Sequence, residues 1–132
     1  MSPAAALTQT SPMIVAIVED QAAIAELLYD VLEDAGYAPV ITSSPVNAAA
    51  EIAEFEADIV LLDIMMPRKD GWEVLDELRA EPATRDVPVI LMSAVCRDGY
   101  SEYYASVSLR AEAYFVKPFA MGAMLSRIRE LL

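Results

Sequence analysis

The chain has 132 residues, of which 56% are hydrophobic, and its formal net charge is −12. A chain of this length forms one domain with a sizeable core, and its acidity argues against direct binding of nucleic acid, which requires clustered lysine and arginine. The sequence contains no histidine and one cysteine, Cys96, which excludes histidine triads, internal disulfides and zinc sites built from histidine or several cysteines.

The N-terminal residues 1–12 are rich in alanine, serine, threonine and proline. They lack the basic start and the apolar centre of a signal peptide, so we expect a flexible tail there. Residues 13–132 form the predicted domain. No apolar run is long enough for a transmembrane helix, and a single cysteine fits a reducing compartment. We therefore expect a cytoplasmic protein that makes no use of a membrane.

Short apolar runs alternate with helical patterns through this domain. The runs predict five strands, at residues 13–19, 39–42, 58–63, 89–92 and 113–116. Apolar residues on one helical face predict helices at 24–35, 46–53, 72–78 and 124–132, and the polar segment 97–110 predicts a short helix. Gly36 has the position of a helix C-cap, and Ser44–Pro45 has the pattern of an N-cap followed by proline in the first turn.

Five repeats of strand and helix indicate an α/β fold in which helices cover both faces of a parallel sheet. We expect a flavodoxin-like (βα)5 doubly wound sheet with strand order 2-1-3-4-5. In such a sheet a ligand binds at the carboxyl ends of the strands, beside the point where the strand order reverses. The first and third strands flank that point, and they end in Glu19–Asp20 and Asp63.

Asp20 and Asp63 are therefore expected to lie a few ångströms apart. Two carboxylates at about 4 Å repel each other by about 4 kcal/mol at an effective dielectric constant near 20, and a divalent cation removes this repulsion. A set of oxygen ligands suits Mg²⁺. The alternative is that Glu19–Asp20 caps the first helix, because aspartate is a good N-cap. Glu19–Asp20 alone would favour the cap, whereas Asp63 on the neighbouring strand favours the metal.

Two further polar residues end predicted strands. Lys117 ends a buried strand and needs an acidic or phosphate partner to stay charged; the alternative to a functional role is a structural ion pair with an aspartate. Ser93 places a hydroxyl at the end of the fourth strand, where serine is also common as a helix cap or turn residue.

Together these residues resemble the receiver domain of two-component response regulators, in particular the stand-alone, chemotaxis-type single-domain regulators. The resemblance extends over about residues 13–132. The matching motifs are Glu19–Asp20, Asp63 with Pro67 and Asp70–Gly71, Ser93–Ala94, and Tyr114 with Lys117–Pro118–Phe119.

The resemblance implies a role for each acidic residue. Asp63 would accept a phosphoryl group from a histidine kinase or a histidine phosphotransfer protein. Glu19, Asp20 and Asp63 would hold Mg²⁺ together with the backbone carbonyl of Met65. Phosphoryl transfer needs mainly positioning and charge neutralisation, which suits this set of residues.

It also implies how the phosphorylated state is recognised. Lys117 would pair with the phosphoryl oxygens, Ser93 would bond one of them, and Tyr114 would act as the aromatic switch behind Ser93. The Lys117–Pro118 peptide bond would be cis. The output surface would be the fourth helix, the fifth strand and the fifth helix, which bind a downstream protein partner or support a phosphorelay.

The lifetime of the phosphorylated state depends on water access. Met65 and Val95 would flank the phosphoryl group, and neither side chain can orient an attacking water. We therefore expect slow self-dephosphorylation and no other enzymatic activity. Tyr100, Tyr103 and Tyr104 offer partner contacts or simply cover the edge of the sheet.

Two alternatives to a phosphoacceptor compete with this interpretation. One is an unphosphorylated protein-interaction module on the same fold, which the intact set of Asp63, Ser93 and Lys117 disfavours. The other is a small hydrolase that forms an aspartyl phosphate, similar to haloacid dehalogenases. Those enzymes carry a second aspartate two residues after the nucleophile, and this chain has Met65 there.

Overall fold

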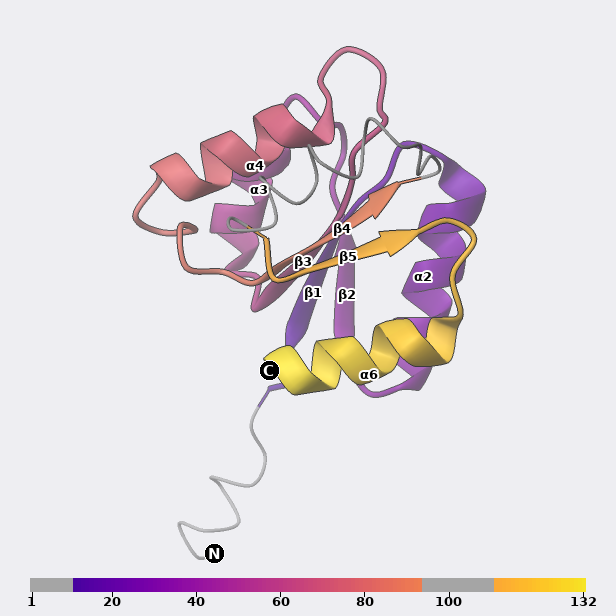
Figure 1. The fold of residues 1–132 in the computed structure, drawn as a ribbon. Coiled ribbons are helices and arrows are strands. Elements are labelled where there is room, and N and C mark those ends of the chain that lie inside the picture. Colours follow the sequence, from indigo (N-terminus) through magenta and orange to yellow (C-terminus); the bar gives the residue numbers. More distant parts are fainter. Residues whose placement is uncertain (1–10, 94–110) are drawn as a thin grey trace, which may run out of the picture.

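The computed structural model describes residues 11–93 and 111–132 (Figure 1). Five parallel strands form one sheet in the order β2-β1-β3-β4-β5, which confirms the predicted topology. The strands are β1 (Ile14–Val18), β2 (Ala38–Ile41), β3 (Ile59–Asp63), β4 (Val89–Ser93) and β5 (Ala113–Val116). The helices within these ranges are α2 (Ala22–Asp34), α3 (Ala48–Phe55), α4 (Gly71–Ala80) and α6 (Met121–Leu131).

Two hydrophobic cores lie on opposite faces of the sheet. Successive strand residues point to opposite faces, so Val15 and Ile17 of β1 belong to one core and Ala16 and Val18 to the other. The first core contains the buried residues of α2 and α6, and the second contains those of α3 and α4. All five residues of β3 are buried, as expected for a central strand with helices on both sides.

The end of α2 agrees with the sequence. Gly36 has a φ of 96°, and its N–H donates to the carbonyl of Glu33 at 3.1 Å while the N–H of Tyr37 donates to the carbonyl of Leu32 at 3.0 Å. This pair of bonds is the Schellman arrangement, which requires a left-handed residue where glycine is favoured.

The start of α3 differs from the sequence-based expectation. The helix begins at Ala48 with Asn47 at the N-cap position, so Ser44–Pro45 does not cap it. Pro45 instead lies in a turn, where its carbonyl accepts a hydrogen bond from the N–H of Ala48 at 3.3 Å. Serine followed by proline suits a turn as well as a first helical turn, and here the chain turns once before the helix begins.

Several predictions fall outside the described ranges. They concern the tail up to residue 10, the short helix at 97–110, Val95 and the three tyrosines Tyr100, Tyr103 and Tyr104. Among the residues that are described, no helix combines the length and the apolar character needed to cross a membrane.

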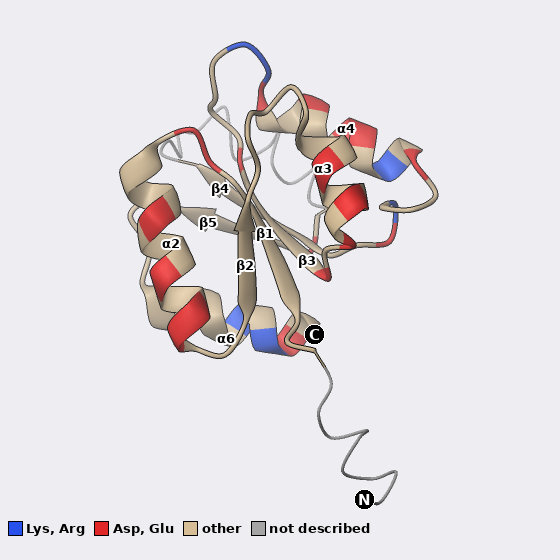
Figure 2. Cartoon of the chain, turned by 180° about the vertical axis from the view of Figure 1, so that it is seen from behind, with Lys and Arg blue, Asp and Glu red and all other residues tan. Residues whose placement is uncertain are grey.

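Charge is unevenly distributed over the helices (Figure 2). The outward side of α2 exposes four acidic residues, Glu26, Asp30, Glu33 and Asp34, and the helix has no lysine or arginine. Basic residues lie on α6 and in the loop between β3 and α4 (Figure 2).

Candidate functional site

The carboxyl ends of four strands carry the residues that the sequence singles out. Glu19 and Asp20 follow β1, Asp63 is the last residue of β3, Ser93 is the last residue of β4, and Lys117 follows β5. Because the strands are parallel and in register, their carboxyl ends lie along the same side of the sheet (Figure 1). We call this side the carboxyl edge and the opposite side, where the strands begin, the amino edge.

Three carboxylates meet at this edge. Oxygen atoms of Glu19, Asp20 and Asp63 lie within 4.8 Å of one another. Glu19 and Asp63 are buried, with 7% and 3% of their surface exposed, and Asp20 is exposed. Buried carboxylates need compensating charge, and oxygen ligands of this kind suit a hard divalent cation. The cluster can therefore hold a metal ion that remains open to solvent on the Asp20 side.

Lys117 supplies the positive charge within the cluster. Its Nζ lies 2.5 Å from Oε1 of Glu19 and 3.5 Å from Oδ2 of Asp63. The lysine side chain is 13% exposed. The Lys117 N–H donates to the carbonyl of Ser93 at 2.6 Å, and the Lys117–Pro118 peptide bond is cis, as the sequence resemblance implied.

Backbone N–H groups hold two of the carboxylates in place. Oε2 of Glu19 accepts from the N–H of Gln21 at 3.2 Å, and Oδ1 of Asp63 accepts from the N–H of Met65 at 3.2 Å. Gln21 is the N-cap residue of α2 and makes no side-chain cap. Asp20 is therefore not the N-cap of α2, and its carboxylate lies in the acidic cluster.

The electrostatic environment raises the pKa of Asp63 to about 7. Burial is the largest cause, and the neighbouring Glu19 carboxylate adds to it through a hydrogen bond and through its charge. The Lys117 ammonium and the N–H of Met65 act in the opposite direction but do not cancel the increase. One lysine therefore leaves the site with surplus negative charge, which a bound cation would neutralise.

The start of α4 fixes the end of β3. Asp70 and Glu73 form a capping box, in which the N–H of Glu73 donates to Asp70 at 3.0 Å. The N–H of Gly71 donates to the carbonyl of Ile64 at 2.8 Å. A Cβ atom on Gly71 would lie 2.4 Å from the carbonyl oxygen of Asp63, so this approach of helix to strand requires glycine.

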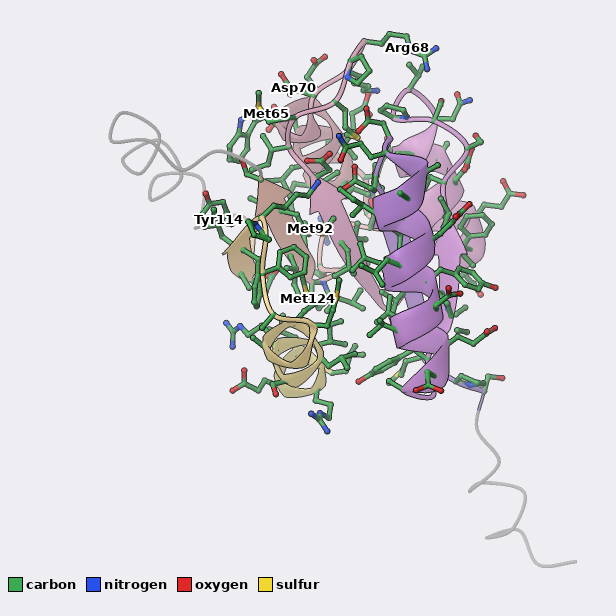
Figure 3. The ribbon with its side chains drawn as sticks, turned by 90° about the vertical axis from the view of Figure 1, so that its right-hand side faces the viewer. Met65, Arg68, Asp70, Met92, Tyr114 and Met124 are labelled. Carbon is green, nitrogen blue, oxygen red and sulfur yellow. The ribbon has the colours of Figure 1, made fainter. Side chains whose placement is uncertain are left out.

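The loop between β3 and α4 forms one rim of the site. Met65, Arg68 and Asp70 lie at the same end of the molecule, and Tyr114 lies on β5 (Figure 3). Arg68 has a φ of 69°, an uncommon conformation for a residue with a side chain. Met65 is 50% exposed.

The response regulator receiver domain family model matches residues 15–129. The chain belongs to this family. A response regulator named MprA from Mycobacterium sp. (strain KMS) is 38% identical over 121 residues, which are 92% of this chain and 51% of the relative. A protein of the same name from Mycobacterium leprae is 38% identical over 120 residues. The chain spans about half the length of the curated relatives it matches.

Solved structures show the same fold. The chemotaxis protein CheY4 of Vibrio cholerae superimposes with a TM-score of 0.81 at 22% identity, over 92% of this chain and 99% of that one. The response regulator TrrA of Thermotoga maritima, solved in complex with Mg²⁺ and BeF, has a TM-score of 0.77 at 30% identity. That match covers 91% of this chain and 99% of TrrA.

The remaining predicted residues of this receiver domain lie as follows. Ser93 is fully buried at the end of β4, where it pairs in register with Val116 of β5. Tyr114 is half-buried and packs against the core that contains α3 and α4. Val95, the second residue expected to limit water access, lies outside the described ranges.

Two features of this receiver domain were not anticipated from the sequence. An acidic partner was expected for Lys117, and Asp63 at 3.5 Å is such a partner, but the sequence did not identify Glu19 as the nearer one at 2.5 Å. Thr42, Ser43 and Arg68 also line a small polar cavity with Glu19 and Asp20. Thr42 ends the second apolar run, so the rule that polar residues end strands would have identified one member of this cavity.

Proposed function

We propose that this receiver domain is a phosphoacceptor signalling switch. Asp63 accepts a phosphoryl group from a phosphohistidine of a histidine kinase or a histidine phosphotransfer protein, in a reaction that depends on Mg²⁺. The observation that carries the proposal is the position of Asp63, which is buried beside two other carboxylates with the Lys117 ammonium 3.5 Å away.

The proposed transfer is an exchange of one bond for another. A carboxylate oxygen of Asp63 forms the new O–P bond while the N–P bond of the donor breaks, and the leaving imidazole nitrogen keeps the bonding electron pair. Little covalent chemistry is required of the protein, because positioning and neutralisation of charge provide most of the catalysis. Lys117 contributes a positive charge next to the accepting carboxylate.

The residues present fit a magnesium site. Glu19, Asp20 and Asp63 would hold the ion with their carboxylates, and Met65 would add its backbone carbonyl. Bound Mg²⁺ neutralises the phosphoryl oxygens as charge develops on them. The complex of TrrA with Mg²⁺ and BeF supports the choice of metal, since that protein shares the fold and 30% of its residues with this chain.

The donor protein must reach Asp63 from the rim of the site. A shallow apolar groove beside Lys117 is lined by Gln21, Ile24, Leu27, Lys117, Pro118, Phe119 and Met121. Leu27 is 50% exposed within it. An exposed apolar surface next to the reacting group is suited to protein contact, and we place the docking surface of the phosphodonor here.

Phosphorylation would be read out on another face. Ser93 would bond a phosphoryl oxygen, and Tyr114 on β5 would move with it. The proposed output surface comprises the segment 96–110, β5 and α6, and its partner would be a downstream protein rather than nucleic acid. A shift in a two-state element of this kind converts a local charge change into a change of partner affinity.

Apart from accepting and slowly losing the phosphoryl group, we propose no enzymatic activity. Met65 and Val95 would exclude an oriented water from the aspartyl phosphate. We also propose that the protein acts in the cytoplasm, where its phosphodonor is accessible.

Mass spectrometry tests the central proposal. Incubation with acetyl phosphate and Mg²⁺ should add about 80 Da, the mass of one phosphoryl group. The variant Asp63→Asn should lose this gain, whereas Asp30→Asn, at an exposed position on α2, should keep it. Labelling of Asp63→Asn would contradict the assignment, and no labelling of the wild type would favour an unphosphorylated interaction module.

A thermal-shift experiment tests the metal site. Millimolar Mg²⁺ should raise the melting temperature, because a ligand that binds only the native state stabilises it. Asp20→Ala should remove most of that increase, and Asp30→Ala should leave it intact. An unchanged increase in Asp20→Ala would place the metal elsewhere on the protein.

A further inference from the structure

We propose that Arg68 attracts the anionic phosphoryl donor toward Asp63 and so offsets the negative potential around the acidic site. This inference rests on the proposed function, because it concerns how the phosphoryl group reaches the accepting carboxylate. The ligand is the phosphoryl group itself, whether a small molecule or a phosphohistidine carries it. Arg68 is then a positioning residue for the approach of the donor and takes no part in the exchange of bonds.

An approaching phosphoryl donor meets like charge. The formal net charge of the chain is −12, and the carboxylates of Glu19, Asp20 and Asp63 gather where the donor must arrive. A negative potential slows the encounter with an anion, and a local positive charge beside the site increases its rate. A cation bound by the cluster would reduce the repulsion there, but the other acidic residues of the chain lie outside the cluster. A basic side chain at the rim would therefore assist the encounter.

Three basic side chains lie around the carboxyl edge in the described part of the chain. Lys117 is paired with two carboxylates of the cluster. The Lys69 side chain is 13% exposed, and its Nζ lies 2.6 Å from a carboxylate oxygen of Glu77. Arg68 is instead exposed, on the loop between β3 and α4 (Figures 2 and 3). The charge of Arg68 is therefore the one that an anion approaching from solvent meets first.

Arg68 also lies beside the side of the cluster that is open to solvent. It lines a small polar cavity together with Glu19, Asp20 and the hydroxyl residues Ser43 and Ser44. Asp20 is the exposed member of the acidic cluster, so the guanidinium adjoins the route by which solvent reaches it. A guanidinium presents several N–H donors in a geometry that matches phosphoryl oxygens. The location and the chemistry of Arg68 both suit a phosphoryl anion.

The backbone conformation at Arg68 would suit another residue better. Its φ is 69°, in the left-handed region where glycine is favoured and most side chains are not. The N–H of Lys69 donates to the carbonyl of Pro67 at 2.7 Å, so the loop turns around Arg68. An unfavourable residue at a strained position points to a use of its side chain. The adjacent acidic site, which must accept an anion, provides that use.

The rate of labelling by acetyl phosphate tests the proposal. The full chain is kept in saturating MgCl₂ at low salt, and the second-order rate constant for the gain of mass is measured. Arg68→Gln should lower this constant about threefold and Arg68→Glu about tenfold, within the range of steering by local charge. Arg68→Lys should stay close to the wild type, because it keeps the charge.

Arg129→Gln is the matched control. It makes the same change of charge at an exposed position near the end of α6, away from the acidic site, and its rate constant should equal that of the wild type. Equal slowing by Arg68→Gln and Arg129→Gln would show that net charge alone matters, and no slowing by Arg68→Gln would show that its charge is not used. Either result overturns the proposal.

Ionic strength separates the approach of the donor from the later chemistry. At about 1 M NaCl the Debye length falls to about 3 Å, so the labelling rates of the wild type and Arg68→Gln should converge. The first-order loss of the phosphoryl group should be the same in both proteins at either ionic strength, because no anion has to approach. A difference in labelling that persists at high salt, or a threefold change in the rate of loss, overturns the proposal.

Arg68→Gly separates the charge of the side chain from the structure of the loop. Glycine is favoured at a φ of 69°, so this variant should have a raised melting temperature and should still be labelled about as slowly as Arg68→Gln. Normal labelling of Arg68→Gly overturns the proposal. Absence of labelling in the wild type would overturn the proposed function as well, whereas normal wild-type labelling with unchanged rates in the variants contradicts only the role of Arg68.

Discussion

The two ends of the strands use charged side chains differently: the charged cluster at the carboxyl ends contains buried carboxylates, whereas the ion pair at the amino ends is partly exposed. At the amino edge, the guanidinium of Arg79 donates to the carbonyls of Val87 and Arg85 at 2.7 and 3.0 Å and pairs with Glu112 at 3.1 Å. The Glu112 carboxylate also accepts from the N–H of Val89 at 2.7 Å. Here the Arg79 guanidinium faces the Glu112 carboxylate, and backbone groups add further hydrogen bonds.

At the carboxyl edge, three carboxylates face the single ammonium of Lys117. Burial, followed by the hydrogen bond and the charge of Glu19, raises the pKa of Asp63 to about 7, and the charge of Lys117 does not offset this increase. The difference between the two ends teaches that an ion pair does not by itself mark a functional site, and that the balance of charge and its burial matter. A balanced network stabilises the fold, whereas an unbalanced one leaves a requirement that a ligand can meet.

The largest expected effect is on the free energy of unfolding, when the Asp63 carboxylate is replaced by a neutral side chain. The folded-state pKa of Asp63 lies above its unfolded value of 3.8, so metal-free protein loses stability as pH rises from about 4 to about 7. Above pH 7, Asp63→Asn should therefore be more stable than the wild type by up to about 4 kcal/mol, at 1.4 kcal/mol per pKa unit. At pH 4 the two should be nearly equal.

Urea unfolding in EDTA at pH 4, 6 and 8 measures this difference. The exposed substitution Asp30→Asn should follow the wild-type profile. If the free energy of unfolding depends on pH in the same way for Asp63→Asn and the wild type, the charges at the carboxyl edge compensate one another as they do at the amino edge. The proposed difference between the two edges would then be wrong.

The next largest effect concerns the support of the carboxyl edge. Gly71→Ala places a Cβ atom 2.4 Å from the carbonyl oxygen of Asp63 and should cost about 3 kcal/mol, as overpacking does. It should also reduce labelling by acetyl phosphate, because the end of β3 must move. Gly122→Ala is the control: nothing lies within 4 Å of its Cβ position in α6, and alanine there should stabilise the helix by up to about 1 kcal/mol.

A smaller effect is expected at the amino edge. Arg79→Met removes the bonds to Val87, Arg85 and Glu112 and should cost about 2 kcal/mol of stability. Labelling of Asp63 should remain normal at a temperature where the variant is folded. Reduced labelling of Asp63 with unchanged stability would mean that Arg79 also supports phosphorylation, and the amino edge would then not be purely structural.

The smallest expected effect is kinetic. Met65→Asn introduces an amide that can orient a water, and the phosphorylated protein should lose its added mass about tenfold faster, a change of about 1.4 kcal/mol in the barrier. Met13→Asn, which changes a methionine that is 44% exposed before β1, should leave the rate unchanged. Equal decay of the two variants would remove Met65 from the control of water access.

Much of the fold and the site follows from local sequence patterns. Unbroken apolar runs such as 58–63 predict strands that are buried on both faces, and parallel strands necessarily bring their carboxyl ends together. This is why Asp20 and Asp63 were expected to meet, and they do. The Gly36 cap was predictable because its pattern involves only neighbouring residues.

The features that the sequence did not predict depend on long-range geometry or on ambiguous local signals. Glu19 and Lys117 are 98 residues apart, and the choice of Glu19 over an aspartate depends on the length and direction of both side chains. Arg79 and Glu112 meet only because the sheet aligns the starts of β4 and β5. The Ser44–Pro45 pattern was misread because a turn and a helix start share the same residues.

The carboxylate cluster joins two layers that the sheet otherwise separates. Glu19 and Asp20 lead into α2 on one face, whereas Asp63 leads into α4 on the other. An ion held by all three residues would fasten the two layers to each other at this edge. Amide hydrogen exchange in the first turns of α2 and α4 should then slow together when Mg²⁺ is added, although the helices belong to different cores. The bound ion would thus couple local unfolding at the start of α2 to local unfolding at the start of α4, so that the two occur as one cooperative event.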